Sequence, residues 1–186
     1  MKSFLTLLTS LVVFRSVYGQ GPPGAVIRGT KGVDESCIYK RKYSEAERLK
    51  FYPFNLADTI MLVSFRYDHD IYPLDQHQFL YDSLIEKRVL SKTEIEQLTD
   101  ILYNNVAKKH GNIGYLTQCF DPHNAILFID KTGRLREYLL ICFLCDRYEA
   151  SSDQIELWDP CNEKIEMMRG FFVSTGIKYG TISTLE

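Results

Sequence analysis

The pattern of apolar and polar positions predicts a buried strand followed by an amphipathic helix. Residues 58–67 form an apolar, partly β-branched run that is typical of a largely buried strand. Residues 92–104 carry apolar side chains at three- and four-residue steps, which places them on one helical face. Ser91 and Glu94 form a capping box before this run, in which each side chain satisfies a backbone donor of the other residue. The sequence therefore predicts a helix over 92–104.

Two further apolar runs, 125–130 and 135–143, predict a β-hairpin. Gly133 lies in the short connection and can supply the positive φ of a three-residue loop with a bulge. If Asp130 faces Arg134, residues whose numbers add up to 264 lie opposite each other. That register places Cys119 near Cys145 and His123 near Ile141.

Three other segments have weaker patterns. A capping box at 44–47 predicts a short helix that ends by Pro53. Residues 72–88 are compatible with a second amphipathic helix, and the glycine-bearing stretch 104–118 reads as a loop.

Asp159 and Pro160 have the residue types that favour the start of a helix, which Gly176 would end. Cys161 would then lie in the first helical turn, where the positive end of the helix dipole stabilises a thiolate. We therefore expect Cys161 to be the most reactive thiol if it is unpaired. Together these elements predict an α+β fold: a small, mainly antiparallel sheet that includes the hairpin, packed by two or three helices.

The N-terminus has the features of an export signal. A lysine at position 2 precedes an apolar run of about eleven residues, and residues 17–19 suit cleavage before Gln20. The run is shorter than the roughly 20 residues of a membrane span, although Arg15 is atypical near a cleavage site. We expect a signal peptide at 1–19, a flexible Gly/Pro-rich leader at 20–36 and a single domain at 37–186, in the periplasm or outside the cell.

The charge balance argues against nucleic acid as a partner. The chain has a formal net charge of −2, and removal of Lys2 and Arg15 with the signal makes it more negative. We expect no nucleic-acid binding and no transmembrane span. The sequence does not identify the partner, and a protein is one candidate.

The five cysteines carry three alternative interpretations. The first is structural: Cys119, Cys142, Cys145 and Cys161 form one or two disulfides that tie the hairpin to the last helix, with Cys37 left over or paired at long range. A bridge between Cys119 and Cys145 is one such pairing. Because five is odd, at least one thiol is free or intermolecular.

The second interpretation is a zinc site. Zinc needs four converging donors, and the sequence offers a C-x-x-C pair with further cysteines and a histidine. The ligands would come from Cys119, His123, Cys142, Cys145 and Cys161. The third is thiol–disulfide exchange by the pair at 142 and 145, although this pair ends a strand, whereas redox pairs usually begin a helix.

Other chemical motifs are weak. The sequence contains no nucleophile elbow, phosphate-binding loop or H-E-x-x-H motif. Residues 68–70 (Asp-His-Asp) and His77 are candidates for metal or acid–base chemistry, but polar residues after a strand usually form a solvated turn.

About 60 residues of the C-terminal half carry a recognisable set of positions. They are Cys119, Pro122, His123, Ala125-Ile126-Leu127-Phe128, Asp130, Gly133, Tyr138, Ile141-Cys142-Phe143, Cys145, Cys161, Phe171-Phe172 and Gly176-Ile177. In these positions the chain resembles the C-terminal half of small, uncharacterised exported proteins of Bacteroidota-type bacteria, which implies a compartment and a fold, but no activity. The sequence thus favours a non-enzymatic binding or structural protein stabilised by disulfides, with a zinc-binding module and then a thiol–disulfide oxidoreductase as alternatives.

Overall fold

The computed structural model describes residues 36–66, 84–108, 120–155 and 161–181, together with two short strands at 74–75 and 78–79. Its centre is a five-stranded antiparallel sheet in the order β5-β2-β7-β8-β9. The strands are β2 (Thr59–Phe65), β5 (Leu84–Val89), β7 (Asn124–Ile129), β8 (Leu135–Cys142) and β9 (Arg147–Ala150).

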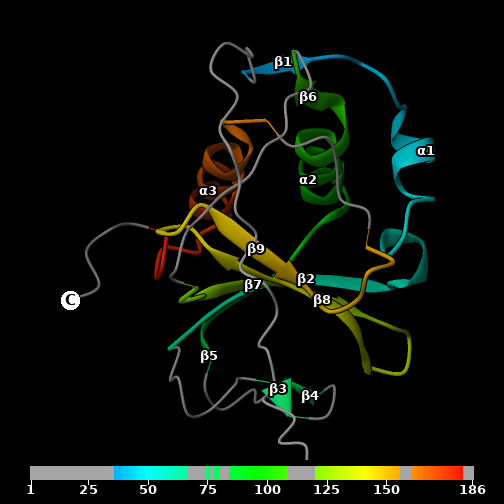
Figure 1. Cartoon of the computed structure of the whole chain (residues 1–186). Coiled ribbons are helices and arrows are strands. Elements are labelled where there is room, and N and C mark those ends of the chain that lie inside the picture. The colour runs from blue at the N-terminus through cyan, green and yellow to red at the C-terminus, as the bar shows by residue number, and fades with distance from the viewer. Residues whose placement is uncertain are drawn as a thin grey trace, which may run out of the picture.

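The described helices lie on one face of this sheet (Figure 1). They are α1 (Glu45–Arg48), the 3₁₀ turn η1 (Phe54–Leu56), α2 (Lys92–Asn104) and α3 (Lys164–Ser174). Two small antiparallel ladders complete the fold: β1 (Cys37–Tyr39) with β6 (Asn105–Ala107), and β3 (Leu74–Asp75) with β4 (Gln78–Phe79). The α+β class with a mainly antiparallel sheet is confirmed.

The predicted helix over 92–104 is confirmed, and so is its capping box. The backbone N–H of Ser91 donates to Glu94 Oε2 at 2.7 Å, and the Glu94 N–H donates to Ser91 Oγ at 3.3 Å. The first of these bonds, from the Ser91 backbone to the carboxylate, is the largest cause of a lowered pKa at Glu94. Leu98 and Leu102 are fully buried against the sheet, so the apolar stripe read from the sequence is the packing face.

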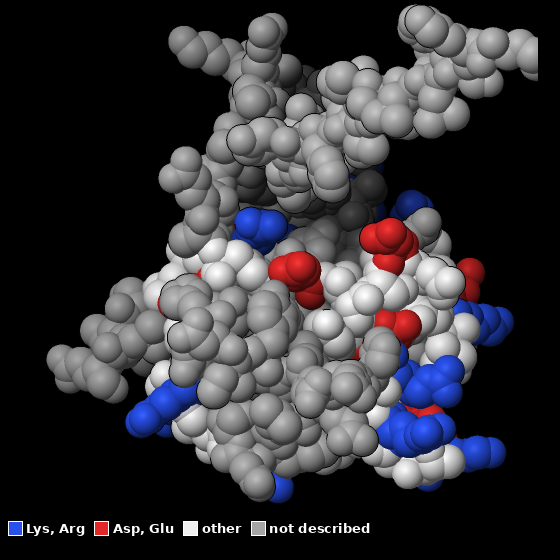
Figure 2. Space-filling view, turned by 60° about the horizontal axis from the view of Figure 1, so that its bottom comes forward, with Lys and Arg blue, Asp and Glu red and all other residues white. Residues whose placement is uncertain are grey.

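Both faces of the central strands are apolar. The face under the helices includes Leu62, Ile126 and Leu139, whereas Val63 and Leu127 belong to a second cluster on the opposite face. Strands buried on both faces read as continuous apolar runs, which is why β2 and β7 show little alternation. Figure 2 is turned toward the side away from the helices, where the described acidic and basic side chains are interspersed.

The hairpin is confirmed, but its register differs from the expected one. Ile129 pairs with Leu135, as the sum of 264 requires, and a bulge then shifts every following pair by one residue. Asn124, and not His123, therefore pairs with Ile141. The turn sets the register only as far as the bulge, because the extra residue in β8 moves the rest of the strand along.

Several predicted element types or bounds were wrong. Residues 84–88 form part of strand β5 and not a helix, because their backbone pairs with β2. Residues 105–107 form β6 within the predicted loop. The first helix, in contrast, follows its capping box as predicted and ends at Arg48, before Pro53. In the described residues no helix is long and apolar enough to cross a membrane.

Candidate functional site

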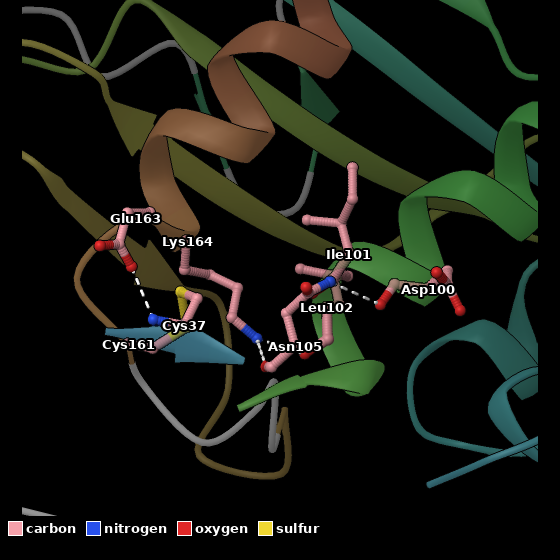
Figure 3. Close-up of a disulfide and its surroundings, with 8 residues drawn as sticks. All are labelled: Cys37, Asp100, Ile101, Leu102, Asn105, Cys161, Glu163 and Lys164. Carbon is pink, nitrogen blue, oxygen red and sulfur yellow. Dashed lines mark hydrogen bonds between the residues drawn. A yellow bond between two sulfur atoms is a disulfide. The ribbon is translucent and has the colours of Figure 1, made fainter. Parts of the chain in front are cut away.

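A long-range disulfide joins the first described strand to the start of the last helix. Cys37 of β1 is bonded to Cys161, which lies 124 residues further on, with 5.0 Å between the two Cα atoms (Figure 3). In the chain-entropy account, closing a loop of this length destabilises the unfolded chain by about 5 kcal/mol. The pairing matches the long-range alternative for Cys37.

Three further contacts hold β1 in place. Its ladder with β6 pairs Cys37 with Ala107, and the Cys37 N–H donates to Glu163 Oε2 at 2.6 Å (Figure 3). The Lys40 N–H donates to the carbonyl of Asn104 at 2.7 Å. β1 is therefore attached to both α2 and α3, although it is only three residues long.

Lys164 connects the same two helices. Its side chain is 1% exposed, and its Nζ donates to the carbonyls of Leu102, at 2.8 Å, and of Asn105 (Figure 3). These acceptors lie at the C-terminal end of α2, where carbonyls lack helical partners and a cation interacts favourably with the helix dipole. The first residue of α3 thus caps the last turn of α2.

The second disulfide closes a tight turn between β8 and β9. Cys142 ends β8, Cys145 lies three residues later, and their Cα atoms are 5.2 Å apart. The Cys145 N–H donates to the carbonyl of Cys142 at 3.3 Å and to its Sγ at 3.1 Å. By the same chain-entropy estimate, so short a loop contributes only about 2 kcal/mol.

Arg169 of α3 covers this turn. Its Nη2 donates to the carbonyl of Phe143 at 2.6 Å, and its guanidinium lies 5.9 Å from the centre of the Phe143 ring. The same side chain pairs with Glu166 at 2.7 Å and with Asp146 at 3.7 Å. A cation shared between two carboxylates therefore lies beside the residue that follows Cys142.

The structure separates residues that the sequence grouped together. Cys161 precedes α3, which begins at Lys164, so the expected helix start near 160 was wrong. Cys161 is bonded to Cys37, so the unpaired thiol on which its expected reactivity depended is not present. Cys145 is paired with Cys142 instead of Cys119. Cys119 itself lies outside the described residues, as do residues 1–35, residues 68–70 and His77.

His123 is held by packing and by polar neighbours. Its Nδ1 lies 3.3 Å from the carbonyl of Phe65, its Nε2 lies 3.4 Å from Asp121 Oδ2, and its ring meets Tyr179 edge-on at 5.7 Å. Across the described ranges no group of three or more His, Cys, Asp or Glu side chains could hold a metal ion. Because Cys119 is not among those residues, zinc binding by this set stays a prediction.

Buried and partly buried polar networks were missed by sequence reasoning. Arg48, which is 4% exposed, donates from Nε to Thr99 Oγ1 at 3.1 Å and pairs with Asp100 at 3.3 Å, and so fixes α1 on α2. Glu86 accepts from Ser64 Oγ at 2.8 Å and from the backbone N–H of Tyr179 at 2.9 Å. Sequence reasoning treats such charged residues as solvated, and only the tertiary contacts show otherwise.

A shallow groove of about 380 Å³ runs between α2 and α3. Its walls include Asp100 and Ile101 from α2 and Gly170 and Phe171 from α3. A Cβ atom added at Gly170 would meet nothing within 4 Å. The volume lies at the lower end of the range for small-molecule sites. Because Gly170 has no side chain, the α3 side of the groove has unfilled space at this position.

Comparison with known proteins gives no relative for this chain. No protein-family model matches it, and neither does any curated protein or solved structure. The resemblance of the C-terminal half to exported bacterial proteins therefore stays a prediction.

Proposed function

We propose that the protein is exported, loses residues 1–19, and has a binding or structural role in the periplasm or outside the cell. The observation that carries this proposal is the bridge between Cys37 and Cys161. Disulfides persist in oxidising compartments and are rare in the cytosol, where thiols are kept reduced. A bridge that closes most of the described chain would have to form outside the cytosol to stabilise the fold.

The position of the bridge supports a structural role for it. It lies where the described chain begins, and it attaches a three-residue strand to the start of α3. So short a strand gains little from its own pairing, and the covalent link adds to the hydrogen bonds to Glu163 and Asn104 in holding this part of the chain. Export with oxidation would then be a requirement for folding of the N-terminal strand.

The experiment is expression of the full chain in a bacterium with a periplasm, followed by fractionation and intact-mass measurement. We expect periplasmic protein that begins at Gln20 and is about two mass units lighter for each bridge. A Leu8→Arg variant, which places a charge in the apolar run, should stay in the cytosol with its leader attached. Wild-type protein that keeps residues 1–19 and has free thiols in the cytosol would overturn the proposal.

A further inference from the structure

We propose that the Cys142–Cys145 pair is a redox-active site that exchanges its disulfide with thiols. The site is distinct from the Cys37–Cys161 bridge, and the activity goes beyond the binding or structural role proposed above. The substrate class is a thiol, or in the reverse direction a disulfide, of a small molecule or an exposed polypeptide segment.

The first argument is that this bridge does little to hold the fold together. Cys142 and Cys145 are three residues apart, and the turn between them is already closed by a hydrogen bond from the Cys145 N–H to the Cys142 carbonyl. The ladder between β8 and β9 continues on from this turn, with Cys142 opposite Arg147. Opening the bridge therefore leaves the turn and its neighbouring strands with their backbone hydrogen bonds.

The second argument is that the turn is arranged to stabilise a thiolate on Cys142. The Cys145 N–H points at the Cys142 Sγ, at 3.1 Å, and would donate to a negative sulfur there. The guanidinium of Arg169 is bonded to the carbonyl of Phe143, the next residue. A backbone donor to the sulfur favours thiolate over thiol. Arg169 is already paired with Glu166 and Asp146, and its part is to hold the Phe143 carbonyl and so to keep the turn in the shape that aims this N–H at the sulfur.

The third argument concerns access. Cys142 is 2% exposed and Cys145 is 5% exposed, whereas Leu144 between them is 47% exposed at the tip of the turn. Both sulfurs belong to buried residues, so the choice between them depends on the leaving group: the N–H that donates to Cys142 Sγ makes Cys142 the better leaving thiolate, and the incoming thiolate attacks Cys145. Leu144 gives an approaching chain segment an apolar contact beside the reacting sulfur.

The exchange balances with two thiols as the reductant. A thiolate attacks Cys145 Sγ, the bond between Cys145 and Cys142 breaks, and its electron pair goes to Cys142 Sγ, which leaves as the thiolate. A second thiolate then attacks the outer sulfur of the mixed disulfide and releases the Cys145 thiolate, and the two protein sulfurs take up, through the solvent, the two protons that the incoming thiols released. Two thiols are oxidised to one disulfide, and the protein disulfide is reduced to a dithiol.

The experiment treats the folded, oxidised protein with reduced glutathione at increasing concentration, with mass-tagged alkylation and peptide mapping to locate the free thiols. We expect Cys142 and Cys145 to become free together at a glutathione concentration at least tenfold below that needed for Cys37 and Cys161, while the far-ultraviolet circular dichroism is unchanged. Resistance of the Cys142–Cys145 bridge until the other bridge opens or the protein unfolds would overturn the proposal.

Two serine variants test the order of attack. Cys142→Ser should trap glutathione on Cys145 as a stable mixed disulfide when the variant is incubated with oxidised glutathione, whereas Cys145→Ser should trap at least fivefold less on the more buried Cys142. Equal trapping in both variants, or none in either, would contradict the assigned roles. Arg169→Gln should slow reduction of the Cys142–Cys145 bridge several-fold, whereas Arg134→Gln, which is exposed just before the far end of β8, should change the rate less than twofold.

Discussion

Lys164 Nζ donates a hydrogen bond of 2.8 Å to the carbonyl oxygen of Leu102, across the interface between α3 and α2. The lysine is the first residue of its helix, and Leu102 lies in the last turn of the other. Both are fully buried. One side chain thus satisfies carbonyls that the end of α2 leaves free, and it does so three residues after the cysteine that holds β1.

Replacing Lys164 by Met should destabilise the fold. The variant keeps the length of the side chain but leaves the Leu102 and Asn105 carbonyls without this donor, and a buried unsatisfied polar group costs about 1–3 kcal/mol. Urea unfolding should show that loss. Lys92→Met is the matched control, since the Lys92 side chain is 85% exposed, and its free energy of unfolding should change by less than about 0.5 kcal/mol. Equal effects of the two variants would show that Lys164 does not cap α2.

The two disulfides should differ in their effect on stability. The double variant Cys37→Ser/Cys161→Ser should lose about 2–5 kcal/mol, because it removes the constraint on a very long loop. The variant Cys142→Ala/Cys145→Ala should lose clearly less, because its loop is short. Chemical denaturation of both variants without reductant measures the difference, and a larger loss in the second variant would contradict this view of the two bridges.

Replacing Gly170 and Gly180 by alanine should change the stability of the fold in opposite directions. Gly170 is an exposed residue inside α3 with open space around it, so Gly170→Ala should stabilise the protein by about 0.5–1 kcal/mol. Gly180 has φ +73°, and an added Cβ would come within 2.7 Å of Asn124 Oδ1 and closer still to the His123 side chain. Gly180→Ala should therefore destabilise the protein, by at least about 1 kcal/mol. Thermal unfolding tests both signs.

Asp130 should make the hairpin sensitive to acid. Its carboxylate accepts hydrogen bonds from the hydroxyl and N–H of Thr132 and from the N–H of Arg134, and these bonds, that from the Thr132 hydroxyl first, lower its pKa from 3.8 to about 2. Because the folded pKa is the lower one, the stabilisation is complete well above pH 3.8 and is lost as the pH falls toward 2.

Carboxyl-carbon NMR should place the midpoint of the Asp130 titration near pH 2. A midpoint near 3.8 would show that the turn does not hold the carboxylate. The variant Asp130→Asn, which cannot ionise, should lose stability at pH 6 and show a weaker dependence on acid than the wild type.

Local signals predicted the elements whose stabilising contacts are local. The helix over 92–104 followed from its capping box and its three- and four-residue spacing, and the hairpin followed from Gly133 between two apolar runs. Leu84 and Ile85 were assigned to a helix because two adjacent apolar residues are compatible with the spacing of a helix and with that of a strand. Their backbone pairing with β2 makes them a strand, and such a long-range contact cannot be read from the local sequence.

Long-range partners explain most of what the sequence did not show. Nothing in the spacing of the cysteines selects Cys161 for Cys37 over the other three, since connectivity depends on where the chain brings them. The burial of Lys164 and Arg48 depends in the same way on carbonyl and hydroxyl groups supplied by distant segments. The turn at 142–145, in contrast, was visible as a C-x-x-C pair at the end of a strand.

The most direct test of the account is peptide mapping of the oxidised protein without reduction, after alkylation of free thiols. The account predicts one disulfide-linked peptide pair that joins Cys37 to Cys161, and a separate peptide in which Cys142 and Cys145 are bridged to each other. An alkylated Cys37, or a Cys37 peptide linked to any cysteine other than Cys161, would contradict it.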